Sequence, residues 1–276
     1  GFYGSTTEGI VKTFSRGGSD VTGSIVANAV NASIYENWTD VSGFLVADPR
    51  VVENPDVISF ITYKELRELS YMGATVLHED AIFPVRSAGI PINIRNTNRP
   101  DDAGTMIVSD DHDFNDDTAT YTITGIAGSK GFSTINIEKA MMNSETGFGM
   151  RVLKVLAENN VSFEHMPSGI DTMSITVDSA TLQPVREKVM TQLRKEINPD
   201  HIEIEDGIAL LAVVGRRMKN TRGTVARIFA ALAHARINVK MIDQGSSELN
   251  VIIGVSANDL NEAIRRIYDM FINSEK

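Results

Sequence analysis

The segment Arg16-Gly17-Gly18-Ser19-Asp20 combines residue types that bind small acidic molecules. The Arg16 guanidinium can hold a carboxylate through two parallel hydrogen bonds. Gly17 and Gly18 allow backbone N–H groups to come close to a ligand. Ser19 offers a hydroxyl and Asp20 a carboxylate where a helix is expected to begin. The segment therefore predicts a site for a carboxylate-bearing substrate; the alternative is that Asp20 only caps a helix after a glycine turn.

A second polar segment, WTDVSGFLVADPR, occupies residues 38–50. Thr39 and Asp40 lie at the carboxyl end of an expected strand, where α/β sheets bind ligands. Arg50 could supply positive charge to a phosphate group. The alternative interpretation is a simple turn, in which Asp48 caps the backbone and Arg50 lies in solvent.

Alternating elements would position these two segments within residues 1–118. Helical spacing or capping signals predict helices, and β-branched or aromatic runs predict strands. Thr62 followed by Glu65 is typical of a capping box at a helix start. The pattern predicts a mostly parallel sheet with helices on both faces. Residues 96–117, rich in Asn, Asp, Pro and Gly, are expected to be a domain boundary with disorder-prone acidic stretches. The expected helices are 20–30, 62–73 and 81–89, and the expected strands are 32–39 and 90–96.

The rest of the chain contains an internal near-repeat with a period of about 75 residues. Both copies have the order β-α-β-β-α, which is typical of ferredoxin-like α+β domains. The first copy has a closing strand at 202–206, whereas the second has none. A strand expected at 120–127 precedes the first copy, so we expect it to complete the second copy's sheet. The expected domains are therefore 1–118, 119–206 and 207–276.

Five segments in fixed order together resemble the aspartate kinases over essentially the whole chain. The resemblance implies the C-terminal part of an amino-acid-kinase domain, an α/β lobe, followed by two ACT domains. It implies transfer of the γ-phosphate of ATP to the side-chain carboxylate of L-aspartate, giving 4-phospho-L-aspartate, with Mg²⁺ neutralising phosphate charge. An end-product amino acid would inhibit through the ACT pair. The segments are GFYG at 1–4, RGGSD at 16–20, WTDVSGFLVADPR at 38–50, INIRNT at 92–97 and QGSSELN at 244–250.

The resemblance also assigns roles to individual residues. Arg16 would bind one substrate carboxylate, while Ser19 and Asp20 would position the other end of the substrate, with Asp20 as the catalytic residue. The family most often has Tyr at position 45 and Lys at position 75, and both differ here. We expect His78 to be structural, because a histidine on a helix face more often has a structural role than a general-base role. Phosphoryl transfer also depends more on positioning than on a base. The residues placed around ATP are Thr39, Asp40, Leu45, Arg50, Thr75 and Val76.

An effector site is expected in the first repeat copy. The helix expected to start at Gly147 presents free N–H groups that suit an amino-acid carboxylate. Glu164 could bind the effector's ammonium group, and this acidic residue favours lysine as the effector, with threonine second. The alternative to an effector site is a plain core strand with a glutamate at its edge. Residues 244–250 would belong to an inter-domain or inter-subunit sheet, or form a polar hairpin turn. The expected effector contacts are Met142, Gly147, Phe148, Ser162, Phe163 and Glu164.

Composition excludes several other classes of protein. The chain has 276 residues, 36 acidic against 26 basic, and a net charge of −10, which argues against nucleic-acid binding. The absence of cysteine excludes disulfides, thiolate nucleophiles and cysteine-based zinc sites, and no protein-held metal is expected. No apolar run is long enough for a bilayer, and residues 1–9 have no signal-peptide pattern. The cytoplasm is the expected location.

The sequence opens within the expected kinase fold, without the family's Lys-Phe-Gly-Gly segment. We therefore expect this polypeptide alone to have no kinase turnover. The alternative function is a non-catalytic, amino-acid-sensing regulatory subunit. A third interpretation is another kinase of this fold that acts on glutamate or a nucleotide. Those kinases lack the tandem ACT tail, so this interpretation ranks low. We also expect a homodimer formed through the ACT domains, because their open sheet edge can pair with a copy of itself.

Overall fold

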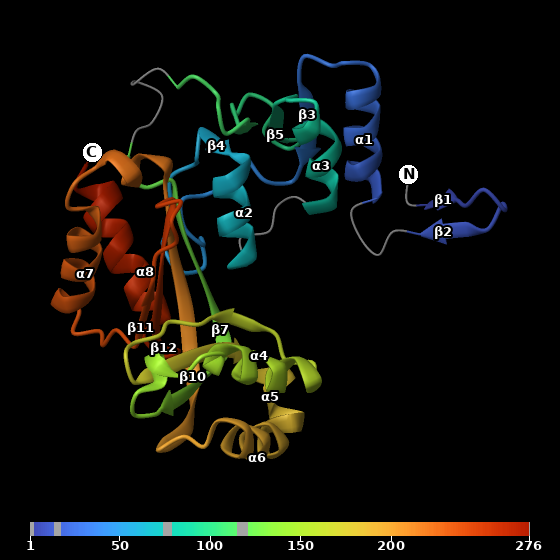
Figure 1. Cartoon of the computed structure of the whole chain (residues 1–276). Helices are drawn as coiled ribbons and strands as arrows, with labels where there is room; N and C mark the ends of the chain where they lie inside the picture. Colours follow the sequence, from blue (N-terminus) through green and yellow to red (C-terminus); the bar gives the residue numbers. More distant parts are fainter. Residues whose placement is uncertain (1–2, 14–17, 74–78, 115–120, 276) are drawn as a thin grey trace.

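A computed structural model describes residues 3–13, 18–73, 79–114 and 121–275 (Figure 1). Strands β1 (Tyr3–Ser5) and β2 (Val11–Thr13) form an antiparallel hairpin that is exposed along its length and stands apart from the other sheets. The remaining described elements form one four-stranded and one six-stranded sheet with their helices.

The four-stranded sheet has the order β3-β5-β6-β4. Strand β3 (Tyr35–Thr39) is parallel to β5 (Ile92–Asn96), and β6 (Thr105–Val108) is parallel to β4 (Phe60–Thr62). The central pair, β5 and β6, is antiparallel. The sheet is thus mixed, and β3 and β5 end together at the same edge.

Three helices accompany this sheet: α1 (Gly18–Ala29), α2 (Tyr63–Tyr71) and α3 (Glu79–Ser87). The predicted capping box of α2 is confirmed. Thr62 Oγ1 accepts a hydrogen bond from Glu65 N at 3.2 Å, and Glu65 Oε2 accepts one from Thr62 N at 2.9 Å. Helices α1 and α3 lie side by side, and α2 is on the side of the six-stranded sheet (Figure 1).

The segment 96–117, expected to be a domain boundary with disorder-prone acidic stretches, contains strand β6 of the four-stranded sheet. This strand lies between β5 and β4, with Thr105 and Ile107 completely buried. Thr105 Oγ1 accepts a hydrogen bond from Phe44 N at 2.8 Å and donates one to Ile58 O at 2.6 Å. A strand of four residues is too short to reveal a periodic pattern among the turn-forming residues around it.

The six-stranded sheet has the order β11-β12-β10-β7-β9-β8, with every pairing antiparallel. Its strands are β7 (Gly125–Glu138), β8 (Phe163–His165), β9 (Thr172–Asp178), β10 (His201–Val214), β11 (Met241–Asp243) and β12 (Asn250–Ser256). Its helices are α4 (Phe148–Glu158), α5 (Ser179–Leu182), α6 (Arg186–Ile197), α7 (Thr224–His234), α8 (Leu260–Tyr268), a π-helical turn (Asp269–Asn273) and 3₁₀ turns at Met142–Ser144, Gln183–Val185 and Arg216–Asn220.

The two long central strands, β7 and β10, belong to both repeat copies. Residues 125–130 of β7 pair with 209–214, and residues 132–138 pair with 201–208. Between these halves the register shifts, and Gly131 adopts a φ of 99°. The first half of β7 therefore pairs with the strand of the second copy, and its second half pairs with the closing strand of the first copy.

The bounds expected for the first of these strands, 120–127, are wrong, and Thr120 lies outside the described residues. The strand begins at Gly125 and does not stop at Ala127. Upstream of it, Tyr121 donates its hydroxyl hydrogen to Asp56, and Thr122 N donates to Glu275 at 3.0 Å. These long-range bonds direct Tyr121 and Thr122 away from β10, and the pairing starts where Thr124 N donates to Val214 O at 2.7 Å.

Two hydrophobic cores stabilise the described chain. One is confined to the first repeat copy and includes Phe148 and Ile175. The other joins the four-stranded sheet and α2 to the second repeat copy without a break. At this junction a Cβ on Gly125 would lie 2.8 Å from Leu69 Cδ1, so β7 and α2 approach very closely. The second copy therefore packs with the α/β part as one body.

Candidate functional site

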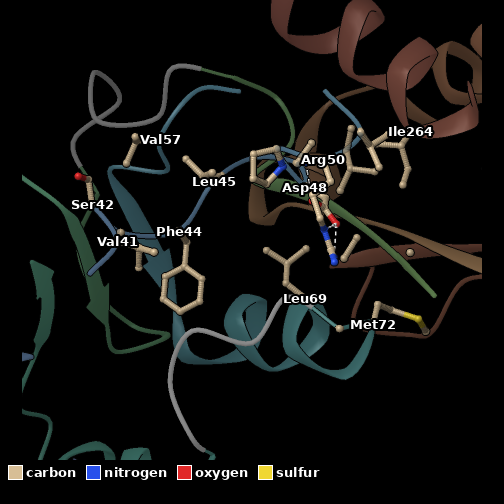
Figure 2. A pocket seen from close by; sticks show the side chains of 18 of the residues that line it. Val41, Ser42, Phe44, Leu45, Asp48, Arg50, Val57, Leu69, Met72 and Ile264 are labelled. Carbon is tan, nitrogen blue, oxygen red and sulfur yellow. Dashed lines mark hydrogen bonds and ion pairs between the residues drawn. The ribbon is translucent and has the colours of Figure 1, made fainter. Parts of the chain in front are cut away.

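A cavity of about 990 Å³ lies between the α/β part and the second repeat copy (Figure 2). Loop residues 40–51 line one side, together with the last turn of α2. Residues 126–130 of β7 and the start of α8 line the other side. The volume lies at the upper end of the range for small-molecule sites, so the cavity can hold a ligand of nucleotide size.

Strands β3 and β5 deliver polar groups to this cavity at their carboxyl ends. Thr39 and Asn96 are register partners at the ends of these strands. Thr97 anchors the loop by donating two hydrogen bonds to Thr39 O, from N at 2.8 Å and from Oγ1 at 2.9 Å. Thr39 Oγ1 donates to Asp40 Oδ1 at 3.2 Å, and the exposed Asp40 lines the cavity. The structure therefore places Asp40 just after the carboxyl end of β3, at the edge where α/β sheets bind their ligands.

Sequence reasoning missed a polar chain beside Asp40. Asn96 Nδ2 donates to Ser42 Oγ at 2.9 Å, and Ser42 Oγ donates to Asp102 Oδ2 at 2.5 Å. All three residues line the cavity. The sequence singles out Ser42 and Asn96 only as members of the 38–50 and 92–97 segments, and it does not indicate their bonds to each other and to Asp102, because the partners are distant in the chain.

The loop that carries Leu45 is fixed by backbone pairing. Ile58 N donates to Phe44 O at 2.8 Å, and Val46 N donates to Asp56 O at 2.9 Å. The half-buried Leu45 lies between these bonds and lines the cavity (Figure 2). An aliphatic side chain at this position provides an apolar surface, without the ring of the tyrosine that is usual in the resembled family.

Arg50 lies at the mouth of the cavity with its guanidinium held by Asp48 (Figure 2). Arg50 Nη2 is 2.7 Å from Asp48 Oδ2, and Arg50 Nε is 3.0 Å from Oδ1. Asp48 Oδ1 also accepts from Arg50 N at 2.8 Å, as a turn cap would. Hydrogen bonding to Arg50 lowers the pKa of Asp48, and the same pair raises the pKa of Arg50. The turn geometry is therefore present, and the exposed cation lines the cavity as well.

Ser19 and Asp20 lie in the first turn of α1. Ser19 is exposed. Asp20 Oδ1 accepts a hydrogen bond from Asn37 Nδ2 at 3.2 Å, and Asp20 O accepts one from Tyr35 Oη at 3.3 Å. Burial is the main cause that raises the pKa of Tyr35. The Asp20 side chain therefore contacts β3 two residues before Thr39, about 7 Å along the strand.

Five positions that the sequence singles out lie outside the described residues: Arg16, Gly17, Thr75, Val76 and His78. Gly73, two residues before Thr75, lines the cavity and has a φ of 99°.

The expected effector residues form two separate groups. In the first, Met142 and Phe148 are buried in the core of the first repeat copy, and Gly147 precedes α4 with a φ of 78°. Lys139 Nζ is 2.6 Å from Glu145 Oε2 and lies 5.6 Å from the centroid of the Phe148 ring. Hydrogen bonding to Lys139 is the main cause that lowers the pKa of Glu145. This loop therefore carries charged groups around a buried aromatic ring.

The second group, Ser162, Phe163 and Glu164, lies on or next to the edge strand β8. Phe163 pairs with Val177 near the end of β9, whereas the 142–147 loop lies near the start of β9, where Asn143 N donates to Ile170 O. Within one chain, the two groups are separated by about 15 Å along β9. Glu164 accepts a hydrogen bond from the hydroxyl of Tyr71 in α2.

The described residues contain neither a clustered set of metal ligands nor a membrane-spanning helix. In this part of the chain, no three His, Cys, Asp or Glu side chains are grouped so that they could hold a metal ion. None of its helices has both the length and the apolar character needed to cross a membrane.

Two segments of the chain match known families. Residues 1–96 match the amino acid kinase family. Residues 211–271 match an ACT domain family. The first match covers α1, the 38–50 loop and β5, and the second covers most of the second repeat copy.

Over almost its full length, the chain is similar to aspartokinases. It is 43% identical to aspartokinase 3 of Bacillus subtilis over 98% of the chain and 59% of that protein. It resembles the aspartate kinase structure of Clostridium acetobutylicum with 57% identity and a TM-score of 0.92, covering 98% of this chain and 62% of that one. It also resembles Escherichia coli aspartokinase III solved with aspartate and ADP, with 26% identity and a TM-score of 0.76, covering 98% of this chain and 59% of that one. The same enzyme solved with lysine and aspartate is similar, with 26% identity and a TM-score of 0.73, covering 97% of this chain and 58% of that one. The chain thus spans about 60% of the length of these relatives.

Proposed function

We propose that the chain is part of an aspartate kinase, which transfers the γ-phosphate of ATP to the side-chain carboxylate of L-aspartate. The observation that carries this proposal is the nucleotide-sized cavity at the carboxyl ends of β3 and β5. Both segments that resemble the kinase sites belong to its surroundings: the 38–50 loop lines it, and Asp20 contacts β3 close to its edge.

The cavity wall has the groups that a nucleotide needs. Leu45 and Met72 provide apolar surface for a base, and Arg50 provides a cation for phosphates. Asp40 is a carboxylate within reach of the same space. Mg²⁺ is held mainly by substrate phosphates with one or two carboxylates, so the described donor set fits such an ion. When bound, Mg²⁺ would neutralise phosphate charge, while Arg50 and the β3 end orient the nucleotide.

The substrate would bind next to the nucleotide. In our proposal Arg16 binds one carboxylate of L-aspartate, and Ser19 and Asp20 position the reacting end. The support is that α1 presents Asp20 to Asn37, and Asn37 shares a face of β3 with Thr39. Thr75 and Val76 complete the nucleotide site in this proposal, since both follow Gly73 at the cavity wall.

Regulation would come from two interleaved, ferredoxin-like ACT domains at residues 119–206 and 207–276, the latter completed by the first half of β7. We infer an amino-acid effector, lysine in preference to threonine, since Glu164 could bind its ammonium. The two effector groups lie apart in one chain, so a second copy paired along the open edge strand β8 would bring them together across a dimer. Exposed Met141, Phe163 and Ile170 provide apolar surface for that contact. A cytoplasmic location completes the proposal.

Calorimetric titration of the chain with L-lysine, L-threonine and MgADP tests the proposal. We expect saturable binding of MgADP and of L-lysine, each with a stoichiometry near one per chain. A chain that binds L-lysine but no nucleotide would favour the non-catalytic sensor instead. Absence of heat with all three ligands would contradict both functions.

A further inference from the structure

Helix α2 carries three polar side chains at three-residue spacing, and each is bonded to a different part of the six-stranded sheet region. Glu65 accepts hydrogen bonds from Arg216, which follows β10, at 2.7 Å (N) and 3.2 Å (Nη1). Glu68 Oε2 accepts one from Asn250 Nδ2 in β12 at 2.5 Å. Tyr71 donates its hydroxyl hydrogen to Glu164 in β8. Residues at this spacing share one face of a helix, so one face of α2 contacts both repeat copies.

The last turn of the same helix forms part of the cavity wall. Leu69, Met72 and Gly73 line the cavity, and Leu69 and Met72 are drawn there in Figure 2. Tyr71 lies between Leu69 and Met72 in sequence. A change in the Tyr71 contact therefore acts on the turn that borders the cavity.

We propose that Tyr71 is a positioning residue that couples an amino-acid effector on strand β8 to the nucleotide cavity. The effector's ammonium would take the Glu164 carboxylate from the Tyr71 hydroxyl, releasing the last turn of α2 from β8. This inference rests on the proposed function, because it assigns a mechanism of regulation to that site.

The three contacts of α2 differ in how easily a ligand can break them. Glu65 is fully buried, whereas Tyr71 has 64% of its surface exposed and Glu164 is only half-buried. A charged ligand can therefore reach the Tyr71–Glu164 contact from solvent, and it cannot reach Glu65. Burial and then the hydrogen bond to the Glu164 carboxylate raise the pKa of Tyr71 to about 12, so the hydroxyl keeps the proton that it donates to Glu164 near neutral pH.

A neighbouring contact keeps β8 in place when Tyr71 is released. His165 Nδ1 lies 2.7 Å from Asp243 Oδ2 in β11. Strands β8 and β11 are the two outer strands of the six-stranded sheet, and this side-chain contact joins them without pairing their backbones. The effector can thus release the last turn of α2 from β8 without separating the two repeat copies, while Glu65 and Glu68 keep the rest of the helix on the sheet.

The test combines two measurements on the whole chain, with Tyr71→Phe as the decisive variant. The first is the Kd of MgADP without and with saturating L-lysine. The second is amide hydrogen exchange of the 66–73 segment under the same two conditions. In the wild type we expect L-lysine to change the MgADP Kd at least fivefold and to accelerate exchange in this segment at least tenfold.

In Tyr71→Phe, which keeps the ring and removes the hydroxyl, we expect L-lysine to bind at least as tightly but to alter neither quantity more than twofold. Lys154→Ala, on the exposed surface of α4, is the matched control and should behave as the wild type. If Tyr71→Phe retains the wild-type response to L-lysine, the coupling role is wrong while the proposed function stands. If the wild type binds neither MgADP nor L-lysine, the proposed function fails together with this inference.

Discussion

Glu65 and Arg216 are joined across the junction between the α/β part and the six-stranded sheet, with the Glu65 carboxylate completely buried. That carboxylate also accepts hydrogen bonds from Thr124 Oγ1 at 2.6 Å and from Thr62 N at 2.9 Å. The Arg216 guanidinium in turn lies 3.7 Å from the centroid of the Phe114 ring. A buried charge with this many donors is fully satisfied, so the pair fixes α2 relative to β10.

We predict that Glu65→Ala lowers the free energy of unfolding by about 3–5 kcal/mol, because it leaves the partly buried Arg216 and two threonines without their acceptor. Urea denaturation measures the change. Glu262→Ala is the control, since Glu262 pairs with Arg265 and Arg266 on an exposed helix face and should cost less than about 1 kcal/mol. Equal effects of the two substitutions would show that the junction does not depend on Glu65.

A glycine next to β6 is predicted to be irreplaceable. Gly104 has a φ of 74°, and a Cβ there would lie 2.0 Å from Ile94 O in β5. Gly89 has a φ of 67° but open space around an added Cβ, so Gly89→Ala measures the cost of the positive φ without a clash. We expect Gly89→Ala to cost about 1 kcal/mol and Gly104→Ala at least about 2 kcal/mol more, because backbone must move. Thermal unfolding of the two variants compares them; similar melting temperatures would contradict the predicted clash.

The stability of the chain is predicted to fall at high pH through Tyr63. Burial raises the pKa of Tyr63 to about 12, and its hydroxyl donates to Ile90 O at 2.8 Å. The unfolded phenol ionises near pH 10, so the unfolded state gains stability first as the pH rises. The contribution of the protonated Tyr63 to the free energy of unfolding is therefore fully present below pH 10 and is lost as the pH rises towards 12.

Urea denaturation at pH 9 and pH 11 for wild type and Tyr63→Phe measures this effect. We expect the wild type to lose more of its unfolding free energy than Tyr63→Phe between the two pH values. Parallel losses would show that Tyr63 ionises equally in both states.

Arg50 and Asp48 provide a matched pair of substitutions for the cavity mouth. Arg50→Ala removes a charge-assisted contact to phosphate and should weaken MgADP binding about tenfold. Asp48→Asn removes the charge that neutralises Arg50 and should tighten MgADP binding or leave it unchanged. Calorimetry measures both, with the exposed Arg265→Ala as control. A loss of affinity in Asp48→Asn as large as in Arg50→Ala would mean that the pair acts only as a turn.

Local patterns in the sequence predicted most of the elements. The Thr62–Glu65 capping box was readable because both partners lie within one turn. The β-α-β-β-α repeats were readable because their longer strands contain apolar runs, such as residues 208–214 and 251–255, between amphipathic helices. In contrast, the bond from Glu65 to Arg216 joins residues 151 positions apart, and no local pattern specifies such a partner.

For the same reason, only one wall of the candidate site could be predicted from the sequence. The 38–50 loop and Asp20 stood out by residue type and by resemblance. The opposite wall, formed by residues 126–130 and by Leu260 and Ile264, consists of ordinary sheet and helix residues. Their role follows from the shared core that brings the second repeat copy against α2, which depends on tertiary packing.

A crystal structure of this chain grown with MgADP would show directly whether the cavity binds a nucleotide. We expect ADP in the cavity bordered by Leu45, Arg50 and Met72, with its phosphates towards Asp40 and the ends of β3 and β5. ADP bound elsewhere, or an empty cavity at saturating MgADP, would contradict the assignment of this cavity as the nucleotide site.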